Sequence, residues 1–316
     1  MTAAVPEGVP LGDGRVVAGG TDRDVTGQGV RLRATAWSGE GPTVVLLHGL
    51  ASQRRFWNLV VPGLVAAGRS VLALDQRGHG DSERPDGPYD IATCAADVVA
   101  VLDDLAVPAA VVVGHSWGAS VALAAAAAAP GRVLSTVAID GGITTPAGIG
   151  PRDEVRRRLE PPRLAVPPAD FATMIGSGPL AGAWTPAHAE AVLPAFALGE
   201  DGLARARLTF DLHMKVLDGL LDADVEAVLG AVTCPCWTVS CEPVEGGLAD
   251  ASYHDEAWAR ARAQGLERAA RLLARPRLLR WGGAVHDVPL QWPSLVAGLV
   301  LAAYDEVSPR PSGGSA

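Results

Sequence analysis

The sequence has little lysine and little cysteine, and each scarcity argues against a class of protein. Lys215 is the only lysine, so the 26 basic residues are nearly all arginine, and the net charge is −9 over 316 residues. Nucleic acids are bound through clustered positive charge, and no basic cluster stands out in this chain. We therefore expect no nucleic acid among the partners of this protein.

Only four cysteines are present, and their spacing does not suit a metal site. Cys234, Cys236 and Cys241 lie close together, but they show no C-x-x-C pattern and no histidine pair accompanies them at zinc-finger spacing. Together with Cys94, they are expected to be free thiols, mostly buried, in a reducing cytoplasm. The sequence thus predicts neither a bound metal nor an organic cofactor.

Long apolar runs are also missing. No stretch reaches the roughly 18 apolar residues that a membrane-spanning helix needs. Residues 1–7 lack the basic and apolar regions of a secretory signal, which favours a cytoplasmic protein without a membrane partner. The Gly- and Pro-rich residues 1–14 and the polar residues 308–316 are expected to be flexible.

What the chain does contain is an alternation of strand and helix patterns. Apolar residues make up 48% of it, which is enough for a substantial core. Two antiparallel strands are expected between residues 15 and 37, and further strands at 43–47, 70–74, 111–113, 133–139, 232–240 and 277–281. Helical patterns separate most of these strands. We therefore predict an α/β fold built on a mostly parallel, helix-covered sheet of eight strands.

The alternation stops between residues 143 and 225, where no buried strand is found. Helical segments are expected there at 153–159, 168–175, 186–198 and 203–221. We interpret residues 143–225 as an inserted helical cap, and residues 15–142 and 226–307 as the core that carries the sheet. The run Arg156-Arg157-Arg158, with acidic neighbours, is expected to be a solvated helix face, and a clamp for carboxylate or phosphate is the alternative.

The candidate nucleophile lies in the stretch Gly114-His115-Ser116-Trp117-Gly118. Three valines form a buried strand before it, and an Ala-rich helical run follows it. G-x-S-x-G between a strand and a helix is typical of a sharp turn that exposes the serine hydroxyl at the N-terminus of the helix. The flanking glycines allow the close backbone approach that such a turn requires.

A serine hydroxyl needs a base to take its proton and a third group to orient that base. His286 is the candidate base, because it follows the last predicted strand within the glycine-containing loop Gly282-Gly283-Ala284-Val285-His286. The remaining histidines are expected to lie in structural motifs or in solvent. His48 and His115 belong to motifs whose backbone matters, His79 lies in a glycine loop, and His188 and His254 are expected to be solvated.

Several motifs in this order resemble the α/β-hydrolase fold superfamily, over roughly residues 16 to 307. His48-Gly49 is similar to the oxyanion-loop motif of that family, and residues 77–82 (Arg-Gly-His-Gly-Asp-Ser) are similar to its loop after the next strand. The stretch 114–118 resembles its nucleophile turn, and His286 resembles its base. The resemblance implies that the backbone N–H groups of Leu50 and Trp117 form an oxyanion hole, and that residues 143–225 are the family's cap.

The acid of the triad is where the sequence departs from the family's common pattern. Most members place it after the strand that corresponds here to 232–240, where Val244 stands at the usual position with Glu242 and Glu245 nearby. Asp140, at the end of the preceding strand, matches an alternative location found in haloalkane dehalogenase relatives. We favour Asp140 and keep Glu242 as the alternative acid.

These residues predict a serine hydrolase that cleaves an ester or a related acyl bond of a small molecule. Dehalogenase and epoxide hydrolase relatives carry aspartate where this chain has Ser116, so an aspartyl-ester mechanism is not expected. Carbon–carbon bond hydrolase, lactonase, thioesterase, cofactor-free perhydrolase and non-catalytic ligand-binding receptor are the alternatives. His213 and Met214 are candidates for the substrate pocket, with core packing as the other interpretation, and a homo-oligomer is left open.

Overall fold

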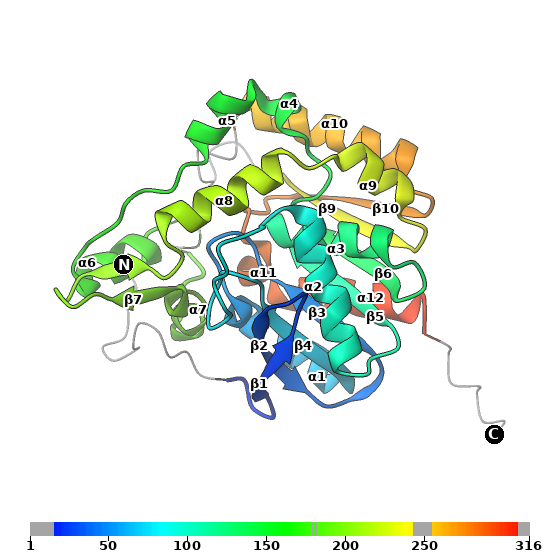
Figure 1. The fold of residues 1–316 in the computed structure, drawn as a ribbon, viewed down its shortest axis with the longest axis horizontal. Coiled ribbons are helices and arrows are strands. Elements are labelled where there is room, and N and C mark those ends of the chain that lie inside the picture. Colours follow the sequence, from blue (N-terminus) through cyan, green and yellow to red (C-terminus); the bar gives the residue numbers. More distant parts are fainter. Residues whose placement is uncertain (1–15, 179, 181, 243–254, 309–316) are drawn as a thin grey trace.

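The centre of the molecule is a sheet of eight strands, in the order β1-β2-β4-β3-β5-β6-β9-β10 (Figure 1). The computed structural model describes residues 16–178, 180, 182–242 and 255–308. β2 is antiparallel to both of its neighbours, and all other pairs are parallel. This confirms the predicted fold class. The strands are β1 (Thr21–Thr26), β2 (Arg31–Trp37), β3 (Glu40–Leu47), β4 (Arg69–Asp75), β5 (Ala110–His115), β6 (Val133–Ile139), β9 (Cys236–Glu242) and β10 (Pro276–Gly282).

Helices cover both faces of this sheet (Figure 1). One face packs against α2 (Ile91–Asp104), α3 (Trp117–Ala128), α9 (Val225–Ala231) and α10 (Glu256–Leu272); the other packs against η1 (Arg54–Leu59), α1 (Val61–Ala66) and α12 (Pro293–Asp305). In β3, Val45 and Leu47 belong to the first core and Val44 and Leu46 to the second, because successive side chains of a strand point to opposite faces. Burial on both faces explains why the central strands are continuous apolar runs.

The segment after β6 contributes no strand to the central sheet until β9. Its helices are α4 (Pro146–Ile149), α5 (Arg152–Arg158), α6 (Pro168–Gly176), α7 (Pro186–Val192), η2 (Leu193–Ala195) and α8 (Phe210–Leu221). The helices predicted at 186–198 and 203–221 are wrong in part, because β7 (Phe196–Leu198) and β8 (Ala204–Ala206) form a small antiparallel ribbon. Its turn has Gly202 at φ +74°, a conformation in which glycine avoids the strain of a side chain.

Buried side chains join this segment to the core. His188 of α7 accepts a hydrogen bond from the N–H of Thr185 at Nδ1, so its Nε2–H donates to the carbonyl of Leu290, 3.1 Å away. Gln53 of the core donates from Nε2 to the carbonyl of Ala191 at 2.8 Å. The expectation that His188 is solvated is therefore wrong: both ring nitrogens are used, and the residue is buried. His254 lies outside the described residues.

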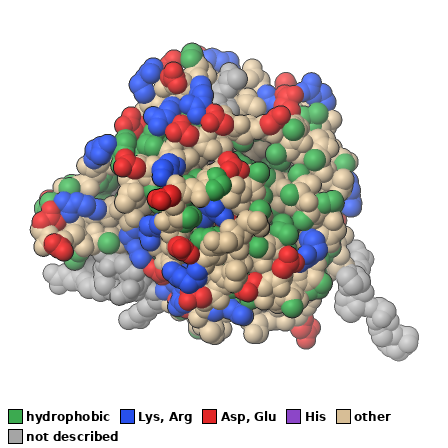
Figure 2. Space-filling model, viewed as in Figure 1, with side chains coloured by type: hydrophobic (Ala, Val, Ile, Leu, Met, Phe, Trp, Pro, Cys, Tyr) green, Lys and Arg blue, Asp and Glu red, His purple; other side chains and the backbone are tan. Residues whose placement is uncertain are grey.

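Acidic and basic side chains are interspersed over the molecular face in Figure 2. In the run 156–158, Arg156 bonds to Asp218 of α8 at 2.8 Å and Arg158 to Asp255 at 2.5 Å. Two of the three arginines thus have acidic partners within the protein. This agrees with the expected solvated helix face better than with a clamp for a carboxylate or phosphate ligand. In the part of the chain that the structure describes, no helix is both long enough and apolar enough to cross a membrane.

Candidate active site

Three side chains from distant parts of the chain meet at the ends of neighbouring parallel strands. Ser116 lies between β5 and α3, Asp140 follows β6, and His286 lies in the loop after β10. The Nε2 atom of His286 is 3.0 Å from the Oγ atom of Ser116, and its Nδ1 atom is 2.7 Å from Oδ2 of Asp140. The arrangement is a continuous hydrogen-bond chain from a carboxylate through an imidazole to a hydroxyl.

The turn at Ser116 is strained in the way that the G-x-S-x-G pattern predicts. Ser116 has φ +54° and ψ −120°, and α3 starts at the next residue. A Cβ atom added to Gly114 would lie 2.0 Å from the carbonyl oxygen of Gly118, and one on Gly118 would lie 2.4 Å from the carbonyl oxygen of Leu47. Both glycines are thus required by close backbone contacts, which lock the turn and expose the hydroxyl at the start of α3.

We expect Gly118→Ala to lower the stability of the protein, because the new methyl group would overlap backbone atoms that cannot rotate away. Overpacking of this kind costs about 1–3 kcal/mol, which urea denaturation can measure. Gly230→Ala is the matched control: Gly230 is also helical, in α9, and a Cβ there meets nothing within 4 Å. That control should leave stability unchanged or raise it slightly. Equal stability of the two variants would contradict the argument from close contact.

Asp140 is held on both sides of its carboxylate. Its Oδ2 accepts the hydrogen bond from His286, and its Oδ1 accepts one from the backbone N–H of Cys241 at 2.9 Å. Burial by itself would raise the pKa of Asp140, but the hydrogen bond and charge of His286 lower this pKa below its usual value. The carboxylate therefore stays ionised, and the Nδ1 atom of His286 must carry the proton that it shares with Asp140.

Glu242 is oriented differently. It ends β9, and its carboxylate accepts a hydrogen bond from Nε of Arg280 on the neighbouring strand β10. Of the two candidate acids, the structure thus brings Asp140, and not Glu242, to the imidazole of His286. Val244 and Glu245 lie outside the described residues.

The loop after β3 brings backbone N–H groups close to the serine. A Cβ atom on Gly49 would lie 3.2 Å from Cβ of Ser116, which is a tight contact, so the loop passes close to the serine. The N–H of Ala51 is bonded to Nε2 of His79, whereas the N–H groups of Leu50 and Trp117 have no acceptor within the described residues. Since Trp117 is the first residue of α3, its N–H also has no acceptor inside the helix.

Four buried histidines surround this region and are held neutral. Burial lowers the pKa values of His48, His115 and His213 to about 4, and that of His79 well below its usual value. His79 also stacks on the indole of Trp117, with ring centres 5.0 Å apart. These four histidines therefore stay neutral across the neutral pH range.

The two pocket candidates lie in the inner face of α8. Met214 belongs to a small apolar cluster with Val155, Leu217 and Leu221, and Leu50 of the loop after β3 packs against this cluster. His213 is also buried. Both residues thus belong to the segment between β6 and β9, and contact with a substrate stays a prediction.

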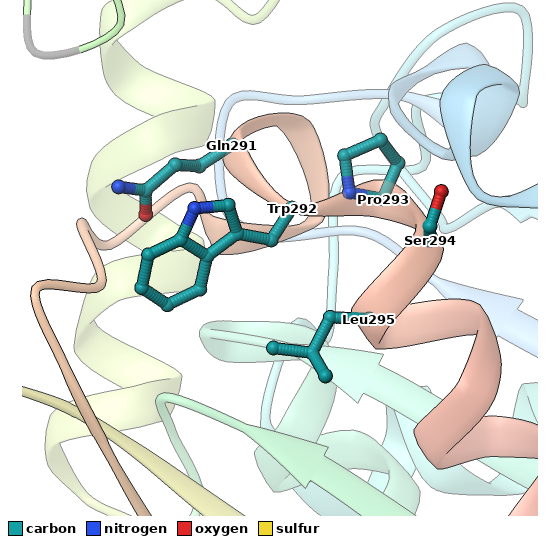
Figure 3. A pocket seen from close by; sticks show the side chains of 5 residues that line it. All are labelled: Gln291, Trp292, Pro293, Ser294 and Leu295. Atoms are coloured by element: carbon teal, nitrogen blue, oxygen red, sulfur yellow. The ribbon is translucent and has the colours of Figure 1, made fainter.

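A shallow groove of about 530 Å³ is present on the C-terminal side of the His286 loop in the sequence (Figure 3). It is lined by residues 291–295 at the junction of α11 (Val288–Gln291) and α12. Gln291 accepts a hydrogen bond from the N–H of Val285 and donates one to the carbonyl of Gly283, which fixes the shape of the loop. Among the described residues, no group of three His, Cys, Asp or Glu side chains is arranged to hold a metal ion.

The side-chain contacts of two histidines were missed in the sequence analysis. The motif around His115 suggests only a backbone role, yet the Nε2 atom of this residue is 2.9 Å from the carbonyl oxygen of His286. His79 lies in a glycine loop, yet its Nε2 atom accepts a hydrogen bond from the N–H of Ala51 in the loop after β3. For His115 the available signal was a polar residue at the end of an otherwise apolar buried strand, because such a residue needs a hydrogen-bond partner.

Comparison with known proteins finds a matching family, relatives in sequence and similar solved structures. Residues 42–172 match the family described as alpha/beta hydrolase fold. The chain is 40% identical to epoxide hydrolase A of Mycobacterium tuberculosis over 142 residues, which are 44% of either protein, so less than half of that relative is covered. It is 32% identical over 240 residues to the putative carbamate hydrolase RutD of Variovorax paradoxus, covering 68% of this chain and 83% of RutD. In structure it resembles E-2-(acetamidomethylene)succinate hydrolase with a TM-score of 0.71 and 23% identity, over 90% of this chain and 99% of the other.

Proposed function

This chain belongs to the alpha/beta hydrolase fold family, and from that premise we propose that it is a serine hydrolase acting on an ester or a related acyl bond of a small molecule. The observation that carries the proposal is the hydrogen-bond chain Asp140–His286–Ser116, with distances of 2.7 and 3.0 Å. Such a series of hydrogen bonds activates a hydroxyl that is otherwise a poor nucleophile.

In the proposed mechanism, Ser116 Oγ attacks the acyl carbon while His286 Nε2 accepts the hydroxyl proton. Asp140 holds the imidazole in the tautomer with hydrogen on Nδ1 and stabilises the imidazolium that forms. The N–H groups of Leu50 and Trp117 stabilise the negative oxygen of the tetrahedral intermediate. His286 then protonates the leaving group, and a water molecule, deprotonated by the same imidazole, hydrolyses the acyl-enzyme.

Acyl substrates fit this site better than epoxides, although several relatives are named epoxide hydrolases. Opening of an epoxide by the hydroxyl of Ser116 would form an ether, and an ether has no carbonyl carbon that water could attack to release the product. Turnover would stop after one event. A carbamate, as named for RutD, has a carbonyl carbon and is compatible with the same serine chemistry.

The acidic limb of the pH profile should belong to His286. The pKa values of His48, His115 and His213 are lowered to about 4, so these side chains do not titrate between pH 5 and 8. Protonated His286 cannot accept the serine proton, and we therefore expect kcat to fall on acidification as this imidazole becomes protonated. A profile that is flat from pH 5 to 8 with chemistry rate-limiting would contradict this assignment.

The same histidines require a control in that experiment. The pKa of each of these histidines is lower in the folded than in the unfolded state, where it is about 6.5. Their contribution to the stability of the folded protein is therefore greatest above about pH 6.5, and it is lost progressively as the pH falls toward about 4. Enzyme preincubated at pH 5 and returned to pH 8 should recover full activity. Loss on return would show denaturation rather than titration of the base.

The proposal is tested by substrate profiling and active-site labelling. A fluorophosphonate probe should label the wild-type protein at Ser116, and p-nitrophenyl esters of increasing acyl length, thioesters, lactones and carbamates should identify the bond that is cleaved. A ligand-binding receptor without an activated serine would not be labelled rapidly. Failure of both labelling and turnover at every chain length would reject the proposed activity.

The remaining partner and location proposals have their own support. A small molecule is the proposed partner because Met214, one of the two pocket candidates on α8, belongs to the apolar cluster against which Leu50 packs. The four cysteines are free, which agrees with our proposal of a reducing cytoplasm as the location.

A further inference from the structure

His115 connects three parts of the candidate site through one imidazole ring. Its Nε2 atom is 2.9 Å from the carbonyl oxygen of His286, and its ring stacks on Phe56 with centres 4.9 Å apart. A Cβ atom added to Gly49 of the oxyanion loop would lie 3.1 Å from its Nδ1 atom. Because His115 is the residue before Ser116, it joins the nucleophile turn to both the base loop and the oxyanion loop.

The hydrogen-bond chemistry fixes the tautomer of this ring. A carbonyl oxygen can only accept, so the Nε2 atom of His115 must carry the hydrogen and donate it to His286. Burial lowers the pKa of His115 to about 4, and the ring is therefore a neutral donor throughout the neutral pH range. Its Nδ1 atom is buried and has no hydrogen-bond partner among the described residues.

An unpartnered buried nitrogen is unfavourable for stability, and an apolar side chain at this position would avoid it. What the imidazole adds is the link from strand β5 to the loop of the base. Gln291 also fixes that loop, because its side chain bonds to the carbonyl of Gly283 and to the N–H of Val285. His115 bonds to the loop from the side of the nucleophile and contacts His286 itself.

We propose that His115 is a positioning residue, whose Nε2–H holds the backbone of His286 so that the imidazole stays within hydrogen-bond distance of Ser116. The inference rests on the proposed serine hydrolase function and adds a further residue to it. A displacement of about 1 Å between reacting groups lowers a rate by about 100-fold, so the loss of this bond should act on kcat. Substrate affinity should change little, because His115 is buried beneath the site.

Two variants of similar side-chain length distinguish the effect of losing the hydrogen bond from the effect of losing the volume of the ring. In His115→Met the donor is absent, whereas in His115→Gln an amide N–H can reach the carbonyl of His286. We expect the Met variant to lower kcat and the fluorophosphonate labelling rate by about 10- to 100-fold with KM within about threefold, and the Gln variant to recover most of the loss. Equal losses in both, or a Met variant within about twofold of wild type, would overturn the proposal.

His188→Met is the matched control. His188 is a buried histidine whose Nε2 also bonds to a carbonyl, that of Leu290, but this bond does not involve the loop residue His286. Its loss should lower the melting temperature as the His115 variants do, with the labelling rate kept within about threefold of wild type. A labelling loss equal to that of His115→Met would show that any lost histidine bond has this effect, and it would overturn the proposal.

A measurement on the wild-type protein tests the same proposal even if a variant does not fold. Long-range ¹H–¹⁵N spectra of ¹⁵N-labelled protein at pH 7.5 report the tautomer of each histidine, and His115 should have its hydrogen on Nε2. Hydrogen on Nδ1 would remove the donor and overturn the proposal. A wild-type protein that fluorophosphonate does not label would instead reject the proposed function, and the tautomer would still decide whether His115 donates to His286.

Discussion

Ser116→Ala should lower turnover of the best ester or acyl substrate by about 10³-fold or more, while the protein remains folded. The variant removes only the hydroxyl, which is the group that His286 Nε2 contacts at 3.0 Å in the proposed triad. The turn itself should persist, since Ala has the same Cβ atom as Ser and meets the same contacts at φ +54°. Residual activity would come from substrate binding and the oxyanion N–H groups.

The measurement is kcat under saturating substrate, with circular dichroism and the melting temperature as controls for folding. Fluorophosphonate labelling of the variant should disappear in the same samples. Wild-type turnover in a folded Ser116→Ala protein would show that another group is the nucleophile. A variant that melts far below wild type would show instead that the hydroxyl is part of the fold.

The central sheet could be predicted from the sequence because its strands carry a simple signal. Strands covered on both faces are continuous apolar runs, and the parallel strands β3 and β5 contain such runs in Val44–Leu47 and Val111–Val113. The ribbon β7–β8 could not be found in this way, because three-residue strands in a small insertion are too short to show any periodicity. Their turn glycine was a signal that the helical interpretation overlooked.

The site was predictable to different degrees, according to how local each signal is. Ser116 follows from a short motif in a strand–turn–helix context, and His286 from its position after the last strand. The side-chain contacts of His115 and His188 depend on partners 171 and 102 residues away in the chain. No periodicity in a single sequence reports such distant hydrogen bonds.

The choice between the two acids also depended on tertiary structure. Asp140 directly follows β6 and Glu242 ends β9, so both lie at the edge of the sheet where Ser116 lies. Arg280, on the adjacent strand β10, binds the carboxylate of Glu242. This pairing, which no sequence pattern indicates, leaves Asp140 as the carboxylate in contact with the imidazole.

Asp140→Asn should lower kcat by about 10³- to 10⁴-fold, as a wrong tautomer does in other triads. The asparagine oxygen would keep the hydrogen bond from the N–H of Cys241, and its amide group would then face Nδ1 of His286. An amide N–H can only donate, so the imidazole would have to carry its hydrogen on Nε2. That atom could then no longer accept the proton of Ser116, although every side chain would still be in position.

Glu242→Gln is the matched control, because it makes the same chemical change at the other candidate acid. It replaces the charge that pairs with Arg280 at a partly exposed position, and we expect it to lower kcat by less than about tenfold. Both variants are assayed on one ester substrate across pH 6 to 9, with their melting temperatures measured. The reverse ranking would transfer the orienting role to Glu242. Losses of similar size in both would mean that the contact between Asp140 and His286 is not what determines the tautomer of the base.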